Sequence, residues 1–202
     1  MRAHLLTLAP IMLIAACGTT ETNSTAAENG TELGTANDAA TMEMADGNQS
    51  SATTTARAML KDASGADRGE ATLTQVGDAV RINISATGLE AGERGYHIHT
   101  TGRCEGPAFE SAGGHWNPTD RQHGRDNPQG QHLGDLPNLT IGADGRGTIE
   151  ATIQNATLTG GTNPVLDDDG AAVMIHAGPD DYRTDPSGDS GSRIACGVVE
   201  AG

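Results

Sequence analysis

Apolar and polar residues alternate in short runs along most of the chain after residue 55. Turn-forming residues separate these runs, which lie at 56–61, 70–75, 80–89, 95–100, 138–141, 147–153, 172–177 and 193–199. Alternation with a period of two is typical of half-buried β-strands, and the period of a helix is missing. The pattern therefore predicts an all-β fold of about eight strands, arranged as an eight-stranded Greek-key β-barrel or sandwich.

Two long segments interrupt this alternation. Residues 101–137 show no strand pattern and are rich in glycine, proline, aspartate and histidine, and residues 178–192 form a second segment of this kind. Loops of this length inside a compact domain are usually functional or disordered. Because the first segment contains three histidines, we expect it to be a functional loop.

The first 17 residues have the features of a secretory signal. Arg2 precedes an apolar run at 5–16 that is too short to span a bilayer as a lasting helix. The sequence Ile14-Ala15-Ala16-Cys17 resembles the bacterial lipobox, in which the cysteine is lipidated and becomes the mature N-terminus. We therefore expect an exported, periplasmic protein that a lipid at Cys17 anchors to a membrane; Gly18 favours the outer membrane. The alternative is an ordinary signal peptide with an incidental cysteine.

Residues 18–55 are predicted to be a disordered tether. They contain six acidic side chains, no basic one and scarcely any large apolar residue. Such a segment cannot bury enough surface to offset the entropy lost on ordering. A coil of this length spans about 35 Å, which would hold a small domain clear of a membrane.

The remaining residues, 56–202, have the size of one domain. Once the six acids of the tether and Arg2 are set aside, 21 acidic and 11 basic residues remain, a net charge of about −10. This charge argues against binding to nucleic acid or to an anionic membrane surface. In an exported domain, Cys104 and Cys196 are expected to form a disulfide rather than a redox pair.

Six of the seven histidines gather in the strand at 95–100, the loop at 101–137 and the strand at 172–177. His97 and His99 are two residues apart, so both rings leave a strand on the same face. This pair alone could equally be a solvated strand face. Imidazoles together with a carboxylate, here Asp135, form a ligand set suited to zinc or copper. A structural zinc needs only four ligands, whereas the six histidines and Asp135 together suffice for two metals.

A series of motifs resembles, in order and in spacing, those of the copper–zinc superoxide dismutases: GYHIH, GRCEGPAFESAGGHWNP, RQHG, HLGDL, IHAGPDD and GSRIACGVV. The resemblance extends from residue 56 to the C-terminus. It includes steps of 8, 9 and 3 residues that lead from His115 to His123, His132 and Asp135. These steps match the zinc-binding loop of that family.

The resemblance implies a role for each of these side chains. It implies one copper cation per subunit, held by His97, His99, His115 and His176, and one zinc ion, held by His115, His123, His132 and Asp135. His115 would bridge the two metals and act in catalysis with Arg193, which guides the anionic substrate. Asp180 would link a copper-binding histidine to a zinc-binding one. Cys104 and Cys196 would form the intrasubunit disulfide of the family.

The implied activity is dismutation of superoxide to oxygen and hydrogen peroxide at a redox-cycling copper, with His115 supplying a proton. A homodimer is left open. One alternative is a metal-binding relative that stores or passes copper without turnover; another is an inert adhesion module, which would leave the histidines unexplained. The loop at 178–192 lacks the lysines of eukaryotic members, and Arg183 is its one base. We therefore expect this protein to encounter superoxide more slowly than a lysine-bearing relative does, and with a weaker dependence on salt.

Overall fold

The computed structural model describes residues 54–202. The signal segment, Cys17 and nearly all of the tether lie outside the described residues, so the lipid anchor and the periplasmic location stay predictions. Within residues 54–202, no helix is both long enough and apolar enough to cross a membrane. The first strand begins at Thr55, one residue before the expected start of the domain.

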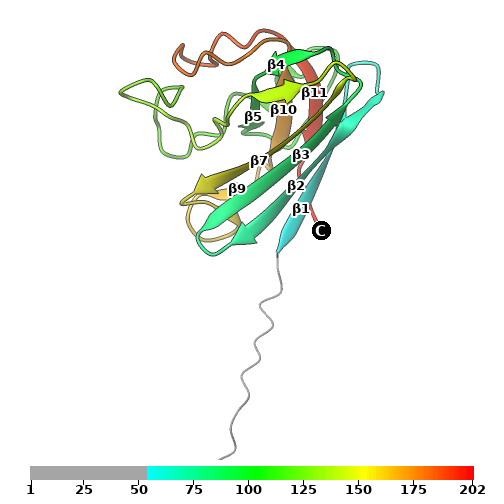
Figure 1. Ribbon diagram of the computed structural model, residues 1–202. Helices are drawn as coiled ribbons and strands as arrows, with labels where there is room; N and C mark the ends of the chain where they lie inside the picture. Colours follow the sequence, from blue (N-terminus) through cyan, green and yellow to red (C-terminus); the bar gives the residue numbers. More distant parts are fainter. Residues whose placement is uncertain (1–53) are drawn as a thin grey trace, which may run out of the picture. The chain divides into compact units, whose positions relative to one another are not determined.

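All eight runs of alternating residues form strands in the structure (Figure 1). These strands are β1 (Thr55–Lys61), β2 (Asp67–Val76), β3 (Ala79–Thr87), β5 (Tyr96–His99), β6 (Leu139–Ile141), β7 (Arg146–Gln154), β10 (Ala172–His176) and β11 (Arg193–Val198). Four further strands were not predicted: β4 (Gly92–Arg94), β8 (Thr157–Thr159), β9 (Pro164–Leu166) and β12 (Glu200–Ala201). Each is too short to show an alternating pattern. A single helical turn, η1 (Glu110–Ala112), lies in the first long loop.

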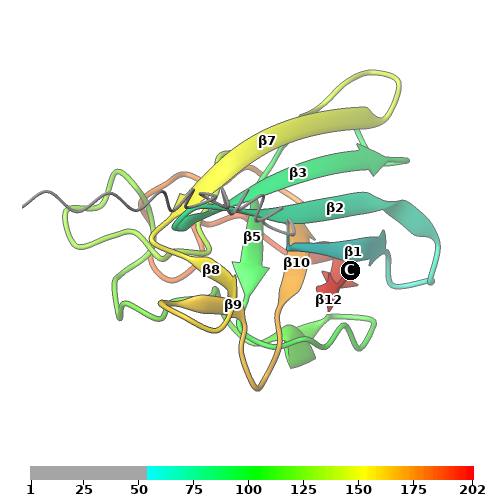
Figure 2. The same ribbon diagram turned by 90° about the horizontal axis from the view of Figure 1, so that it is seen from below.

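The main sheet is antiparallel and curled, with the strand order β5-β10-β11-β1-β2-β3-β7 and β12 beside β1. Strands that follow one another in sequence are not always neighbours, since β10 lies between β5 and β11. Only Gly95 separates β4 from β5, and β4 pairs with β6, which leads into β7. The views in Figures 1 and 2 show how the sheet curls around the core. This topology confirms the predicted all-β, Greek-key architecture.

Alternate residues of the long strands form the core. Leu60, Leu73 and Ile82 are completely buried, and Leu73 lies directly opposite Ile82 in the pairing of β2 with β3. Burying a side chain of this size contributes about 1.5–3 kcal/mol, so the alternation seen in the sequence is also the main source of stability. Tyr96 and Trp116 are the large aromatic side chains of this core.

The first long loop folds back along the edge of β5 that does not pair with β10. The Trp116 N–H donates to the Ile98 carbonyl at 2.7 Å, and the Ile98 N–H donates to the Gly134 carbonyl at 3.0 Å. Further along, the Asp126 N–H donates to the Tyr182 carbonyl at 3.0 Å, which joins this loop to the second one. The two loops thus cover the same part of the sheet (Figure 2).

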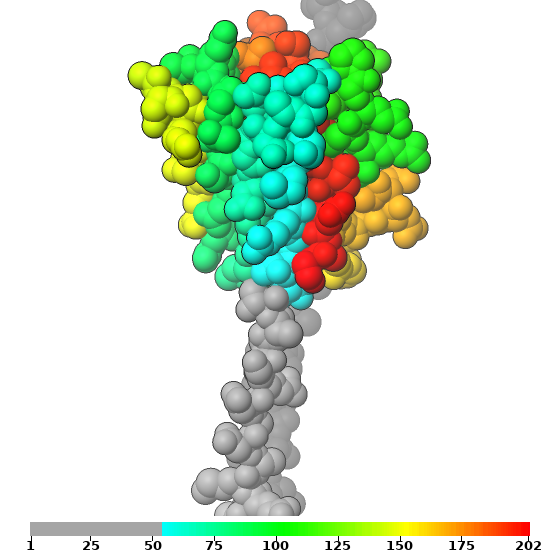
Figure 3. Space-filling view, turned by 90° about the vertical axis from the view of Figure 1, so that its right-hand side faces the viewer, coloured from blue at the N-terminus to red at the C-terminus, as the bar shows by residue number. Residues whose placement is uncertain are grey.

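A disulfide joins the first long loop to the last long strand, as predicted. Cys104 and Cys196 are bonded, with a Cα–Cα distance of 5.7 Å and a sequence separation of 92 residues. Phe109 and Ala112 pack against this bond. The strand that carries Cys196, shown in red in Figure 3, lies beside β1, shown in cyan. The disulfide therefore attaches the loop to the centre of the sheet.

We expect the disulfide to contribute substantially to stability, because closing a loop of this size stabilises a protein by about 4 kcal/mol in the chain-entropy model. The double variant Cys104→Ser/Cys196→Ser should lose approximately that free energy of unfolding, measured by urea denaturation of the metal-free protein. Reduced wild-type protein should show the same loss. A difference below about 1 kcal/mol would contradict the prediction.

Candidate metal centre

Backbone pairing around β5 brings the predicted ligands together. His97 and His99 lie on this strand, and isolated β-bridges place Asp135 opposite His97 and His115 opposite His99. On the other side of β5 lies β10, which ends at His176. Residues far apart in the chain therefore meet because their backbones are hydrogen-bonded to, or next to, the same short strand.

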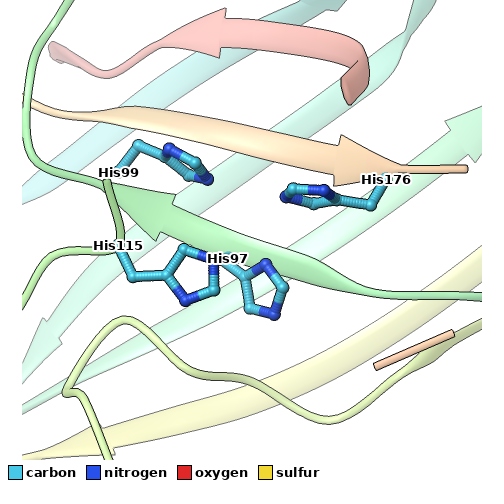
Figure 4. A group of neighbouring side chains, drawn as sticks. All are labelled: His97, His99, His115 and His176. Carbon is cyan, nitrogen blue, oxygen red and sulfur yellow. The ribbon is translucent and has the colours of Figure 1, made fainter. Parts of the chain in front are cut away.

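Four histidines form a cluster that we call the four-histidine group: His97, His99, His115 and His176. Their rings face a common space (Figure 4). The ring centroids of His97 and His115 are 3.8 Å apart, those of His97 and His176 4.9 Å, and those of His99 and His115 5.1 Å. One nitrogen from each ring lies within 4.8 Å of the others, and all four residues are buried.

One nitrogen of each ring in this group has no hydrogen-bond partner among the described residues. These atoms are His97 Nδ1 and the Nε2 atoms of His99, His115 and His176. Leaving a buried polar atom unpaired costs about 1–3 kcal/mol, so four such atoms in one cluster require an explanation. Imidazole nitrogens are good ligands for copper, and the group fits that ion.

The opposite nitrogen of three of these rings is held by the protein. His99 Nδ1 donates to the Gly113 carbonyl at 3.0 Å, and His176 Nδ1 donates to the Gly191 carbonyl at 3.1 Å. His97 Nε2 lies 2.7 Å from Asp180 Oδ2. A carbonyl oxygen can only accept, so Nδ1 of His99 and of His176 carries the proton. Each ring then turns the lone pair of Nε2 toward the shared space, the arrangement that a metal ligand needs.

A second cluster, the three-histidine, one-aspartate group, consists of His115, His123, His132 and Asp135. The Nδ1 atoms of the three rings lie 2.9, 3.0 and 3.1 Å from the same oxygen, Asp135 Oδ1. The other carboxylate oxygen accepts from the backbone N–H groups of Gly124 and His132 at 2.9 and 3.0 Å. Three imidazole nitrogens and one carboxylate oxygen are ligands of the type and number that zinc takes in four-coordinate sites, and the group fits that ion.

Asp180 connects the two groups. Its Oδ2 contacts Nε2 of His97 at 2.7 Å, and its Oδ1 contacts Nε2 of His123 at 3.0 Å. Gly188 packs directly against this bridge, where a Cβ atom would lie 1.9 Å from Asp180 Oδ1. Any larger residue at 188 would displace the carboxylate. Asp180 is therefore placed as predicted, between one histidine of each group.

The pKa values of the four-histidine group favour neutral imidazoles. Burial lowers the pKa of His97 to about 3, although the hydrogen bond to Asp180 opposes this shift. Burial, together with the neighbouring His115, lowers the pKa of His99 to about 2, and burial lowers that of His176 to about 4. The pKa of His115 is also lowered by burial. The neutral ring is the form that binds a metal.

In the three-histidine, one-aspartate group the carboxylates dominate. Burial alone would lower the pKa of His123, but hydrogen bonds to Asp135 and Asp180 raise it to about 9. Burial would raise the pKa of Asp135, but the three surrounding histidines lower it well below its usual range. Burial would likewise raise the pKa of Asp180, but its hydrogen bonds with His123 and His97 lower it. Both carboxylates are therefore ionised at neutral pH and place negative charge where a cation would be bound.

Arg193 lies beside the four-histidine group. Its Nη1 donates to the Phe109 carbonyl at 2.6 Å, and its Nη2 donates to the Gly113 carbonyl at 2.7 Å. The Gly113 carbonyl also accepts from His99. The half-buried guanidinium is thus fixed next to His99, a predicted copper ligand, because both side chains donate to the same carbonyl.

The structure brings together all seven predicted metal-binding side chains, with Asp180 and Arg193 next to them; Cys17 lies outside the described residues. Sequence reasoning did not find the residues that support this arrangement. Asn138 holds the backbone of Asp180 through two hydrogen bonds of 2.8 and 2.9 Å, and Tyr182 packs between the two loops. The one feature of the sequence that could have pointed to Asn138 and Tyr182 is their position directly after the first long loop and within the second.

Comparison with known proteins agrees with this geometry. Residues 67–199 match the family model described as copper/zinc superoxide dismutase. The chain belongs to the copper/zinc superoxide dismutase family. It is therefore an oxidoreductase of that class, and the clustered side chains around β5 are groups that could hold metal ions.

Relatives in this family cover most of the described residues. Superoxide dismutase [Cu-Zn] 2 of Aquifex aeolicus is 42% identical over 148 residues, which are 71% of this chain and 85% of the relative. A superoxide dismutase-like protein of Bacillus subtilis is 47% identical over 124 residues, 60% of this chain and 63% of that protein. The crystal structure of a double mutant of a superoxide dismutase-like protein from the same organism has a TM-score of 0.68 at 43% identity, covering 70% of this chain and 95% of that one.

The free energy of unfolding of the metal-free protein should fall both below and above about pH 6.5, the pKa of an unperturbed histidine. Below that value the unfolded chain binds protons at His97, His99 and His176, whereas the folded chain does not until about pH 4 to 2. Three such groups give a slope of at most about 4 kcal/mol per pH unit. Above 6.5, the folded state keeps a proton on His123 that the unfolded state releases, so this stabilisation is lost as pH rises through 9.

We therefore expect a maximum in the free energy of unfolding near pH 6.5, measured by urea denaturation after removal of metals with a chelator. The variant His123→Gln should lose the decline between pH 6.5 and 9 and keep the decline on the acid side. A free energy of unfolding that does not change between pH 6.5 and 4.5 would contradict the assignment of neutral, buried imidazoles.

Proposed function

We propose that this protein dismutes superoxide to oxygen and hydrogen peroxide, with copper in the four-histidine group and zinc in the three-histidine, one-aspartate group. The observation that carries the proposal is the set of buried imidazole nitrogens that have no hydrogen-bond partner in the described part of the chain. Four of them face one space, and the shared residue His115 also takes part in the second group. Two adjoining sites with one common ligand are more than a structural zinc requires.

His115 is proposed to bridge the two metals. Its Nδ1 lies 2.9 Å from Asp135 Oδ1, on the zinc side, while its Nε2 is buried and unpartnered on the copper side. Both nitrogens of an imidazole can bind a metal once the ring has lost its proton. The position of the ring between the two groups supports this role.

A copper ion in the four-histidine group would supply the one-electron oxidation and reduction that dismutation requires. The reaction also consumes protons, and we propose that His115 Nε2 holds and delivers one of them. The ring keeps its orientation while it does so, because its Nδ1 side is fixed beside Asp135. Nδ1 of His99 and Nδ1 of His176 already carry a proton that they donate to a backbone carbonyl. These two atoms therefore cannot take up the proton that His115 Nε2 is proposed to hold.

Arg193 is proposed to attract and hydrogen-bond the anionic substrate. The carbonyls of Phe109 and Gly113 each take one of its N–H groups, which leaves further donors of the guanidinium for an anion. Both acceptors belong to the part of the first long loop that follows Cys104, and the disulfide attaches this part to β11. The guanidinium is therefore held in one orientation. A fixed cation next to the reacting centre stabilises an anion better than a mobile one.

Site-directed variants should separate the two metal sites. His176→Ala should lose copper and reduce the rate of superoxide consumption by at least about a hundredfold, since even supporting residues of metal sites contribute ten- to a hundredfold. It should keep its full content of zinc. Asp135→Ala should lose zinc first. Metal content per chain, measured by mass spectrometry together with superoxide consumption in stopped flow, tests both expectations.

Two outcomes would argue against the proposal. A wild-type protein that binds copper and zinc but does not consume superoxide would indicate a copper store or carrier. Equal loss of both metals in His176→Ala would show that the two sites are not separate. Arg121→Met, which removes an exposed arginine from the first loop, serves as the unaffected control.

The lysine-free second loop gives a separate prediction. The domain has a net charge near −10, which repels superoxide, and Arg193 is the fixed cation of the site. Replacing the exposed neighbour Ser192 with lysine should raise kcat/KM at low ionic strength by about threefold through steering. The rate of Ser192→Lys should then fall more steeply with added salt than that of the wild type. Ser192→Gln is the control for side-chain size, and an equal salt dependence in both variants would contradict the prediction.

A further inference from the structure

Tyr182 lies where the two long loops meet, and the first loop holds it from three directions. The Asn138 N–H donates to the Tyr182 hydroxyl at 2.7 Å. The Asp126 N–H donates to the Tyr182 carbonyl at 3.0 Å. The Arg125 guanidinium lies over the ring, 3.7 Å from its centroid, which is the geometry of a cation–π contact. Tyr182 thus joins the second loop to the zinc-binding loop, beside a second contact in which the His123 N–H donates to Asp185 Oδ1 at 2.6 Å.

The backbone of Tyr182 also orients Asp180. Its N–H donates to Asp180 Oδ1 at 2.6 Å, the same oxygen that contacts His123 Nε2. Gly124, next to His123, approaches Tyr182 so closely that a Cβ atom would lie 2.2 Å from the Tyr182 carbonyl oxygen. A displacement of Tyr182 would therefore be transmitted to the carboxylate that links the two metal groups.

A cavity lies directly beside this contact. It has a volume of about 210 Å³, and Arg125, Tyr182, Leu136 and the zinc-side residue Asp135 are among the residues that line it. Asp135 is itself buried by the surrounding loop. Asp135 therefore borders both the cavity and the three-histidine, one-aspartate group, and Arg125 and Tyr182 form part of the cavity wall.

We propose that Tyr182, clasped by Arg125 and Asn138, is a positioning residue that latches the second loop onto the zinc-binding loop and controls the exchange of the zinc ion. With the latch closed, Asp180 holds His123 in the orientation that presents Nδ1 to the metal. With the latch open, Asp180 and His123 lose this alignment and the cavity beside Asp135 widens. The inference rests on the proposed zinc site, but not on the superoxide chemistry.

The test is the rate at which zinc leaves the full-length protein loaded with copper and zinc, followed with a chromogenic chelator. Tyr182→Leu removes the stacking contact and the hydroxyl, and zinc release should become about tenfold faster. Tyr182→Phe keeps the ring under Arg125 and should give a smaller increase. Arg125→Met should accelerate release, whereas Arg121→Met, on the same loop without such a contact, should not.

A global loss of stability is separated from the latch by a core variant. Leu158→Ala creates a cavity in the core away from both loops and should leave the zinc release rate within about twofold of the wild type, even if it lowers the unfolding midpoint more than Tyr182→Leu does. The copper site supplies an independent readout, because a displaced Asp180 frees His97 Nε2 and should change the electron paramagnetic resonance spectrum of bound Cu(II) in Tyr182→Leu.

Wild-type release rates in Tyr182→Leu and Arg125→Met would overturn the latch. Acceleration in Leu158→Ala equal to that in Tyr182→Leu would also overturn it, as would a wild-type protein that holds no zinc. Faster zinc release in a protein that fails to consume superoxide would support the latch while rejecting the proposed dismutase activity. The two ideas are therefore distinguished by the same set of samples.

Discussion

The constraint on which the metal-binding geometry depends is the burial of imidazole nitrogens that have no hydrogen-bond partner within the part of the chain that the structure describes. Four ring nitrogens, one from each member of the four-histidine group, are buried without a hydrogen-bond partner among residues 54–202. Each such atom destabilises a fold in the absence of a ligand, because it has lost water and gained nothing in return. A chain can keep this arrangement only if the rest of the domain is rigid enough to prevent the rings from turning toward other partners.

That rigidity comes from several kinds of contact. The curled sheet supplies His97, His99 and His176 on adjacent strands, whose register is fixed by antiparallel pairing. Backbone carbonyls and Asp180 then hold the far nitrogen of the His97, His99 and His176 rings, so each of these rings has one orientation. A metal would complete a site that is already formed, and its binding energy would add to the stability of the fold.

Much of this could be predicted from the sequence, for physical reasons. Alternation of apolar and polar residues reports which face of a strand is buried, so every described strand of four or more residues was found, whereas of those with three residues or fewer only β6 was. His97 and His99 share a face because the strand period is two. The contact of Tyr182 with Arg125 and Asn138 could not be found in this way, since it arises where two irregular loops meet. Neither loop has a period that would reveal which side chains face each other.

The disulfide shows how a stabilising element also shapes the reactive centre. Cys104 attaches a segment whose carbonyls, at Phe109 and Gly113, are the acceptors for Arg193. Phe109 packs in the same apolar cluster as Cys196, so the position of its carbonyl depends on that cluster remaining closed. Reduction of the disulfide would free the segment at one end. Since Gly113 also accepts from His99, Arg193 and the His99 ring would lose their common support together. The oxidation state of a bond that takes no part in the chemistry is thereby linked to the alignment of the residues that do.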